Sequence, residues 1–326
     1  MKSSGRWLPG ARLLTLLPFA LLATGCGSKQ DALRPDSPPA HGIATIWWIM
    51  LAGSVVGLGL IVALLVGAWF KRGVEGADRP GTITVIALGI VTPILVLAAL
   101  FAYSDIFLIR GTSPPVAAAA TNDLSVRVIG HQFWWEVRYP GSGVVTANEI
   151  HIPVRTHVIV SVHSDDVIHS FWVPQLNRKI DVFPDQVNRV ELYADKPGRY
   201  RGQCAEFCGL QHAHMGFYVF AEPRAAYERW LRAQARPAKR FNALFDDKCS
   251  SCHAIQGTPA HAHVGPDLTH VGSRTSLAAL TIPNTAAHMA DWLRNTQQVK
   301  PGSQMPDLNL TNAQVRQLTR YLEGLK

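Results

Sequence analysis

Two long apolar runs in the first third of the chain constrain its fold more than any other feature. They cover residues 43–70 and 81–109, and each is longer than the ~20 residues that cross a bilayer as a helix. No acidic or basic residue interrupts them before Asp105, near the end of the second run. The loop between them carries three Lys and Arg residues, which places it in the cytoplasm by the positive-inside rule. We therefore predict a transmembrane hairpin over residues 43–110, with both ends outside the cytoplasm.

The N-terminal 25 residues have the pattern of a bacterial export signal. Basic residues precede an apolar stretch, residues 13–22, that is too short to span a membrane. Small residues then lead to Cys26, as in lipoprotein signals, where the cysteine becomes the lipidated first residue of the mature chain. A conventional signal peptide followed by a free cysteine is the alternative. We expect a signal peptide over residues 1–25 and a short periplasmic segment over residues 26–42.

The middle of the chain, residues 121–222, has the pattern of an all-β domain. Its short segments alternate apolar with polar residues and are separated by turns that contain Pro, Gly and Asp. These segments are LSVRVIG, VIVSVH, VNRVELYA and GFYVFA. They predict an antiparallel sandwich or barrel. A short basic helix and linker follow over residues 223–240, and apolar residues at helical spacing predict an α-helical domain over residues 241–326.

The net charge of +8 does not indicate a nucleic-acid-binding protein. The basic excess lies in residues 1–40, with five Lys and Arg against two acidic residues, and in residues 223–240, with six against one. These segments are a terminus and a linker, and the folded domains are close to neutral. Because neither domain has the composition of a basic binding face, we exclude nucleic acid as a partner.

The segment RGQCAEFCGLQHAHMG, residues 201–216, combines two cysteines with histidine and methionine. A structural disulfide between Cys204 and Cys208 would leave the other two residue types unexplained. A zinc site of two Cys and one His is possible, but it would not need the thioether of Met215. Two thiolates with His212 and a weak Met215 ligand suit copper held for electron transfer. Such a site needs one more imidazole, and His169 in DDVIHSFWVP is the candidate.

A second motif, CSSCH, begins at Cys249 and has the C-x-x-C-H spacing of covalent haem c attachment. Cys249 and Cys252 would form the thioethers, and His253 would bind the iron. We expect the sixth ligand to be Met305, which lies between Pro and Gly residues, because Met289 lies in a helix-like segment where methionine is usually packing. The remaining candidates for this ligand are histidines: His261, His263, His270 and His288.

Three segments resemble the signatures of subunit II of the haem-copper cytochrome c oxidases: CAEFCGLQHAHM, DVIHSFWVP and GHQFWWEVRYP. The resemblance covers roughly residues 40–222. The segment GPDL, residues 265–268, which follows CSSCH, and a terminal helix with Tyr321 resemble a class I cytochrome c over most of residues 241–326. Together they resemble a caa-type oxidase subunit with a fused cytochrome c. This implies a two-helix transmembrane hairpin, an all-β cupredoxin-like Greek-key sandwich and a C-terminal all-α cytochrome c domain.

The family resemblance also implies the cofactors and their ligands. Two copper ions would form a copper A centre bridged by both thiolates, and a haem c would be bound covalently. The implied copper ligands are His169, Cys204, the backbone carbonyl of Glu206, Cys208, His212 and Met215. The Glu206 carboxylate is also a candidate ligand for magnesium at the border with subunit I.

The position where the family usually has an electron-accepting tryptophan is Phe133 in this chain. Trp134 and Trp135 follow it and are the candidate electron relays, with core packing as the alternative role. His214 falls at a variable position of the copper motif, and we expect it not to be a ligand. The histidines of strand-like segments are expected to be ordinary surface or packed residues: His131, His151, His157 and His163.

The resemblance implies subunit II of a proton-pumping cytochrome c oxidase in the bacterial inner membrane. Electrons would pass from the haem c to copper A and then to haem a of subunit I, where oxygen is reduced to water. A fused donor needs no diffusional encounter with its acceptor. The implied partners are subunit I, other oxidase subunits, membrane lipid and an external donor such as cytochrome c or the bc1 complex. The alternatives are a subunit of a copper A-type nitric oxide reductase and a membrane-anchored copper chaperone.

Overall fold

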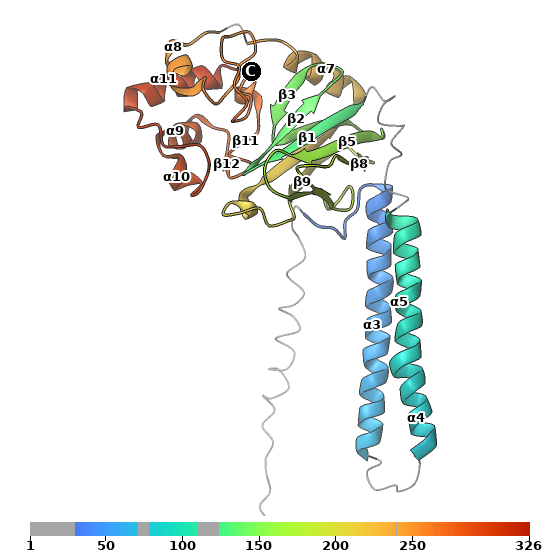
Figure 1. Cartoon of the computed structure of the whole chain (residues 1–326). Helices are drawn as coiled ribbons and strands as arrows, with labels where there is room; N and C mark the ends of the chain where they lie inside the picture. Colours follow the sequence, from blue (N-terminus) through green and yellow to red (C-terminus); the bar gives the residue numbers. More distant parts are fainter. Residues whose placement is uncertain (1–29, 71–77, 110–123, 239) are drawn as a thin grey trace, which may run out of the picture.

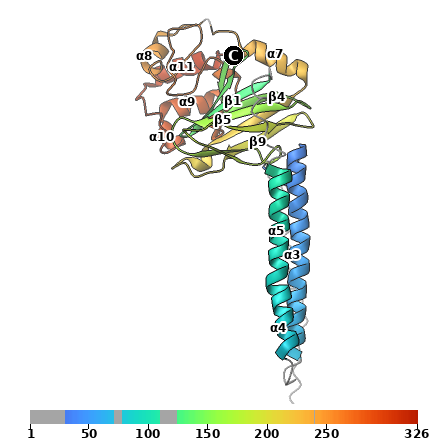
Figure 2. The ribbon, with the colours of Figure 1, turned by 45° about the vertical axis from the view of Figure 1, so that its right-hand side comes forward.

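A computed structural model describes residues 30–70, 78–109, 124–238 and 240–326. It has three parts: a long helical hairpin, a β-sandwich domain at one end of the hairpin, and a helical domain packed on the sandwich (Figure 1). Figure 2 shows the same arrangement after a rotation. The expected signal peptide and Cys26 lie outside the described residues.

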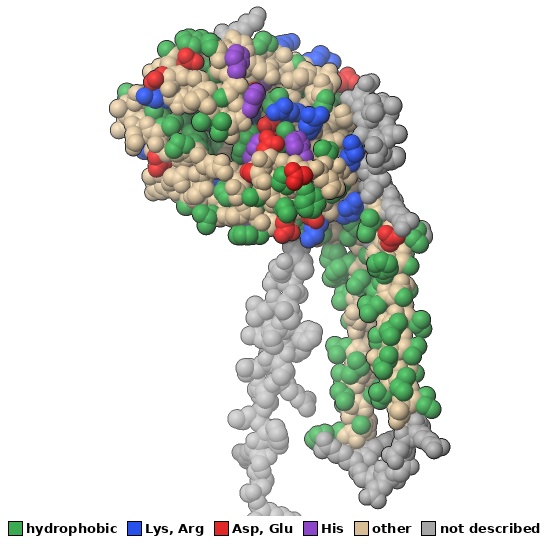
Figure 3. Space-filling model, viewed as in Figure 1, with side chains coloured by type: hydrophobic (Ala, Val, Ile, Leu, Met, Phe, Trp, Pro, Cys, Tyr) green, Lys and Arg blue, Asp and Glu red, His purple; other side chains and the backbone are tan. Residues whose placement is uncertain are grey.

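Both predicted membrane segments form helices that are long and apolar enough to cross a bilayer, Pro38–Phe70 and Gly81–Ile106. Their apolar side chains are exposed along both helices (Figure 3). The first segment is α3 (Pro38–Phe70), and the second combines α4 (Asp78–Ile86), the π-helical η1 (Ala87–Val91), α5 (Thr92–Tyr103) and the π-helical η2 (Ser104–Ile109). Pro93 gives a reason for the first π segment, because it has no N–H to donate and its ring crowds the carbonyl four residues earlier.

Helix α3 begins at Pro38, five residues before the predicted apolar run, because the preceding residues anchor it to the sandwich. The Ser37 hydroxyl accepts from Ala40 N (3.2 Å) and donates to the carbonyl of Leu176. Asp36 donates its backbone N–H to Gln175 O at 2.9 Å, and its carboxylate accepts from the Tyr200 hydroxyl. The start of the hairpin is therefore fixed to the sandwich domain.

The sandwich domain, residues 124–222, consists of two five-stranded sheets. The first has the order β3 (Val144–Ala147), β2 (Trp134–Tyr139), β1 (Ser125–His131), β5 (Val158–Ser164), β8 (Asn188–Leu192). The second has the order β4 (Glu149–Pro153), β10 (Gly216–Glu222), β9 (Gly198–Cys204), β6 (His169–Trp172), β7 (Ile180–Val182). Two pairs, β1 with β5 and β4 with β10, are parallel, and the others are antiparallel. The architecture confirms the predicted cupredoxin-like sandwich.

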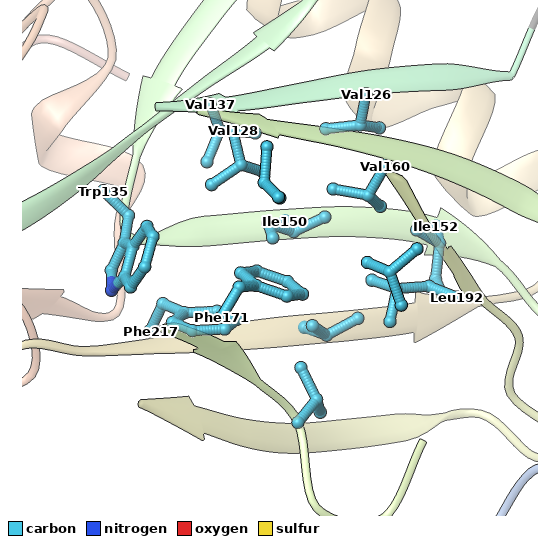
Figure 4. Close-up of a cluster of buried hydrophobic side chains, with 14 of the residues drawn as sticks. Val126, Val128, Trp135, Val137, Ile150, Ile152, Val160, Phe171, Leu192 and Phe217 are labelled. Carbon is cyan, nitrogen blue, oxygen red and sulfur yellow. The ribbon is translucent and has the colours of Figure 1, made fainter. Parts of the chain in front are cut away.

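The core lies between the two sheets and consists of large apolar side chains from both (Figure 4). Trp135 and Phe217 meet edge to face at 5.5 Å between ring centroids, and Phe171 stacks on Phe217 at 4.6 Å. Burying each such side chain stabilises the fold by roughly 1.5–3 kcal/mol. This packed core holds the strand ends in place.

The helical domain follows α7 (Arg224–Gln234) and contains α8 (Ala243–Cys249), α9 (Ala286–Arg294), α10 (Thr296–Val299), α11 (Asn312–Glu323) and the short strands β11 (Ser276–Leu277) and β12 (Ile282–Pro283). Side chains of Asn242 and Thr285 cap α8 and α9, and Thr311 forms a capping box with Gln314 at the start of α11. Helix α11 buries Val315 and Leu318 in the core of this domain. The predicted helical domain is therefore confirmed.

Candidate metal and haem sites

The two cysteines of the sandwich domain lie close together at the end of β9. Cys204 is the last residue of that strand, and Cys208 follows in the cysteine loop, which we define as residues 204–215. Their sulfur atoms are 3.8 Å apart, both side chains are buried, and neither is in a disulfide. A sulfur pair at this spacing can hold a metal ion between the two thiolates.

The other candidate copper ligands divide between the two sulfur atoms. Near Cys204, His169 Nδ1 lies at 3.8 Å and the backbone oxygen of Glu206 at 3.2 Å. Near Cys208, His212 Nδ1 lies at 3.7 Å and Met215 Sδ at 3.8 Å. The structure thus brings all six predicted donors together as two similar halves. Soft sulfur donors with imidazole nitrogen form a set suited to copper.

Backbone pairing positions these donors. Strand β6, which begins at His169, pairs with β9 so that Phe171 lies opposite Cys204. The loop is fixed by Ala205 N donating to Ser170 O at 2.9 Å and Cys204 N donating to Met215 O at 3.0 Å. A donor set attached to a paired strand end has little freedom to change its geometry.

Asp166 orients His169, a contact that the sequence did not reveal. One carboxylate oxygen lies 2.8 Å from His169 Nε2, which directs Nδ1 towards the sulfur atoms. The other accepts from Gln132 N at 2.6 Å. Gly130 leaves room for the ring, since a Cβ there would lie 2.7 Å from His169 Cδ2. The sequence signal, in hindsight, is an aspartate three residues before the histidine.

The electrostatics of the buried sulfur pair favour one thiolate before metal binds. The hydrogen bond from Cys208 lowers the pKa of Cys204 to about 3, with a further contribution from His169, although burial acts in the opposite direction. Burial lowers the pKa of His169, but the hydrogen bonds and negative charges of Asp166 and Cys204 together outweigh it, so the net shift is upward. The site therefore combines the thiolate of Cys204 with the oriented imidazole of His169.

The histidines expected not to be ligands have other partners. His214 is exposed and lies 2.8 Å from the side-chain oxygen of Gln211. His131 stacks on Trp134 at 4.4 Å and faces Glu136 at 3.5 Å. The three others each face a carboxylate: His151 with Glu222, His157 with Glu191 and His163 with Asp165.

A cavity in the helical domain brings together the haem-attachment residues. Cys249 at the end of α8, Cys252 and His253 line it, together with Met305 and Met289. His253 Nδ1 lies 2.8 Å from Pro266 O, an arrangement that leaves Nε2 as the ligand atom for a metal. Among the described residues that line the cavity, none is one of the four alternative histidines.

The chemistry of the cavity wall fits haem. Arg274 lines it, is buried, and has an Nε with no hydrogen-bond partner. A buried guanidinium with an unused N–H suits the carboxylates of a haem. Met289 lies in the buried core of α9, whereas Met305 is partly buried on a loop whose backbone is held by Thr296 and Gln297. This loop position makes Met305 the better candidate for a second residue to hold the haem iron.

The cavity borders the cysteine loop. Gln132, Phe133 and Trp134 of the sandwich domain form part of its wall. The Phe133 ring packs against Gly209, and Gln132 Nε2 donates to Cys208 O at 2.5 Å. Trp135 is buried beneath, 5.7 Å from the His169 ring, and its indole N–H donates to Met215 O at 3.3 Å. Gln132 and Phe133 therefore line the cavity and also contact the cysteine loop.

Comparisons with known proteins agree with this architecture. The family model of the cytochrome C oxidase subunit II periplasmic domain matches residues 142–221, and that of cytochrome c matches residues 238–326. The first domain implies copper A and the second haem c. Cytochrome c oxidase subunit 2 of Alkalihalophilus pseudofirmus is 29% identical over 98% of both chains. The corresponding protein of Bacillus sp. strain PS3 is 32% identical over 63% of both.

Among solved structures, the periplasmic domain of subunit II of cytochrome oxidase (CoxB) of Bradyrhizobium japonicum is 28% identical over 36% of this chain and 96% of that one, with a TM-score of 0.34. The family matches together include both domains, and the relative from A. pseudofirmus aligns with nearly the whole chain, hairpin included. The chain belongs to the cytochrome c oxidase subunit II family and carries a C-terminal cytochrome c domain, which makes it a component of a haem-copper oxidoreductase in a membrane.

Proposed function

We propose that this chain is the electron inlet of a proton-pumping cytochrome c oxidase. Its helical domain receives electrons from an external donor, and its sandwich domain passes them to haem a of subunit I, where oxygen is reduced to water. The observation that carries the proposal is the meeting of six copper-type donors around one sulfur pair, beside a cavity that contains the haem-attachment motif. Bound copper and haem supply reversible one-electron chemistry.

In this proposal Cys204 and Cys208 would be the thiolates that hold two copper ions. His169 and the Glu206 carbonyl complete one half of the site, and His212 and Met215 complete the other. The pairing of β6 with β9 and the hydrogen bond of Asp166 keep the donors in place when the charge of the site changes. Small structural change on reduction favours fast transfer at low driving force.

Cys249 and Cys252 would attach the haem covalently, and His253 and Met305 would bind its iron. His253 is fixed by the Pro266 carbonyl at 2.8 Å. A methionine ligand raises the haem potential, which suits a donor to copper.

We propose that electrons cross between the domains at residues 132–134. Gln304, beside Met305, donates to Gln132 Oε1 at 3.5 Å, and Gln132 in turn donates to Cys208 O at 2.5 Å. Phe133 and Trp134 also line the cavity at this boundary. This route requires no tryptophan at position 133, because it enters the copper site through the Cys208 backbone; Trp135 is a second relay on the His169 side.

The same proposal places the chain in the bacterial inner membrane, with Cys26 lipidated and both folded domains on the periplasmic side. Glu206 and Phe207 are exposed beside the copper site, and we assign that surface to subunit I. The Glu206 carboxylate would then be positioned to share a magnesium ion with that subunit. The external donor would be a cytochrome c or the bc1 complex.

The test uses the full-length chain in detergent, matured with haem and loaded with copper. We expect an EPR signal from one unpaired electron shared by two coppers and the optical spectrum of a six-coordinate haem c. Cys208→Ser should abolish the shared signal and leave the haem spectrum, whereas His214→Ala should change neither. A single-copper signal in the unmodified chain would refute the copper A assignment. In the assembled complex, turnover of nitric oxide instead of oxygen would replace the oxidase with a reductase.

A further inference from the structure

A buried lysine joins the helical domain to the sandwich domain. Lys300 follows α10 and is 3% exposed. Its ammonium donates to Phe133 O at 2.9 Å, His214 O at 2.9 Å and Ala278 O at 3.0 Å. The first two carbonyls belong to the sandwich domain and the third to the helical domain. All three N–H groups of the ammonium are thus used, and they tie together segments that are distant in the sequence.

Such a group is unusual because a buried charge is costly unless it is fully hydrogen-bonded. Burial lowers the pKa of Lys300 to about 7, while three carbonyl dipoles at hydrogen-bond distance act in the opposite direction. An apolar side chain could fill the same space without this cost. The hydrogen bonds that the ammonium makes to both domains therefore give a reason for a lysine at this position.

The carbonyl from the helical domain belongs to a strained turn. Ala278, Ala279 and Leu280 have φ values of 52°, 56° and 65°, a left-handed conformation in three consecutive residues that are not glycine. Strain of this kind persists only where the surroundings enforce it. The sandwich domain enforces this turn through two contacts. Gly216 N donates to Ala279 O at 3.2 Å, and Leu280 packs on Gly216, where an added Cβ would lie 3.1 Å from Leu280 Cδ1.

The position of Lys300 connects this contact to both sites. The residue lines the haem cavity. Of its two partners in the sandwich domain, His214 belongs to the cysteine loop, and Phe133 packs against Gly209 of the same loop. A shift of this contact would change the separation of the Met305 loop from Gln132, because Lys300 and the Met305 loop are only a few residues apart.

We propose that Lys300 is a positioning residue that fixes the haem-bearing face of the helical domain against the cysteine loop. Its ammonium holds the strained turn and the two sandwich-domain carbonyls in one arrangement. The effect on electron transfer rests on the proposed function, whereas the effect on the contact between the domains does not.

The test compares Lys300→Met with Lys326→Met, which removes an exposed lysine from the same domain. Lys300→Gln retains an N–H donor without charge and serves as the milder variant should Lys300→Met fail to fold. The N–H of Gly216 donates a hydrogen bond to Ala279 O of the other domain. Its exchange is measured by hydrogen–deuterium exchange in the full-length holoprotein. Transfer from haem to copper is measured after flash reduction of the haem, and the haem and copper spectra check that both centres remain.

We expect Lys300→Met to accelerate exchange at Gly216 and slow transfer, each at least tenfold, with both spectra unchanged, and Lys326→Met to resemble the unmodified chain. Unchanged exchange in both Lys300 variants would overturn the proposal. Faster exchange with an unchanged transfer rate would refute the role in transfer. If the unmodified chain itself transfers no electrons, the proposed function fails, and the exchange result alone decides the role of Lys300 at the contact.

Discussion

Replacing Asp166 with asparagine tests how much the copper site depends on a residue that is not itself a ligand. The carboxylate lies 2.8 Å from His169 Nε2 and accepts from Gln132 N at 2.6 Å. Asparagine keeps one acceptor oxygen. If that oxygen stays with Gln132, the amide N–H₂ faces His169 Nε2, which must become the acceptor. The proton then moves to Nδ1, the atom that faces the sulfur pair, and copper must displace it.

The expected magnitude follows from this change of tautomer. Loss of a hydrogen-bond partner behind a metal-binding histidine typically costs 10–100-fold in metal affinity, or about 1.4–2.8 kcal/mol. Copper affinity of the full-length chain is measured by competition with a chelator of known strength. Asp165→Asn is the matched control, because Asp165 is adjacent and half-exposed and faces His163 and His131 instead. Equal copper affinity for Asp166→Asn and the unmodified chain would refute the role of Asp166.

Three further predictions concern the haem, the packing and the pH dependence. Met305→Leu should convert the haem to a five-coordinate optical spectrum and lower its potential, while Met289→Leu should leave the spectrum unchanged; the reverse result would exchange their roles. Gly130→Ala should displace His169, since the added Cβ would lie 2.7 Å from its ring, and we expect about 1–3 kcal/mol lower stability in thermal unfolding together with weaker copper binding; normal values for both would contradict the close packing. Burial raises the pKa of Glu136, but the hydrogen bonds and charges of His131 and Arg138 together lower it by more, so the net shift of the pKa is downward. The folded-state pKa is depressed, so this stabilisation is present above the unfolded pKa of ~4.3 and is lost as the pH falls below it; Glu136→Gln should flatten that part of the unfolding profile, and identical acid unfolding curves would count against the contribution.

The hairpin could be predicted, and the ligand sets could be proposed, because their signals are local. An uncharged run longer than a bilayer is thick, or a C-x-x-C-H spacing, has a meaning that hardly depends on the rest of the chain. The start of α3 lies five residues before the predicted apolar run for the opposite reason. Residues 38–42 are helical because Ser37 and Asp36 are bound to the sandwich domain, and no pattern in the sequence shows that contact.

The residues that support the sites were also hidden. Asp166 and Gln132 look like ordinary loop residues in the sequence, and they acquire a role only when β1 and β6 bring them to the sulfur pair. Lys300 reads as a surface lysine, yet it is 3% exposed because two domains close over it. Long-range packing of this kind follows from the complete fold and has no local period or spacing.

The central claim is that one chain delivers electrons from its own haem to its own copper site. Flash reduction of the haem in the full-length chain, loaded with copper and kept in dilute detergent solution, tests it most directly. We predict that the haem is reoxidised while copper is reduced, at a rate independent of protein concentration, and that Cys208→Ser abolishes this step. A haem that stays reduced, or one whose reoxidation rate rises with protein concentration, would contradict the account.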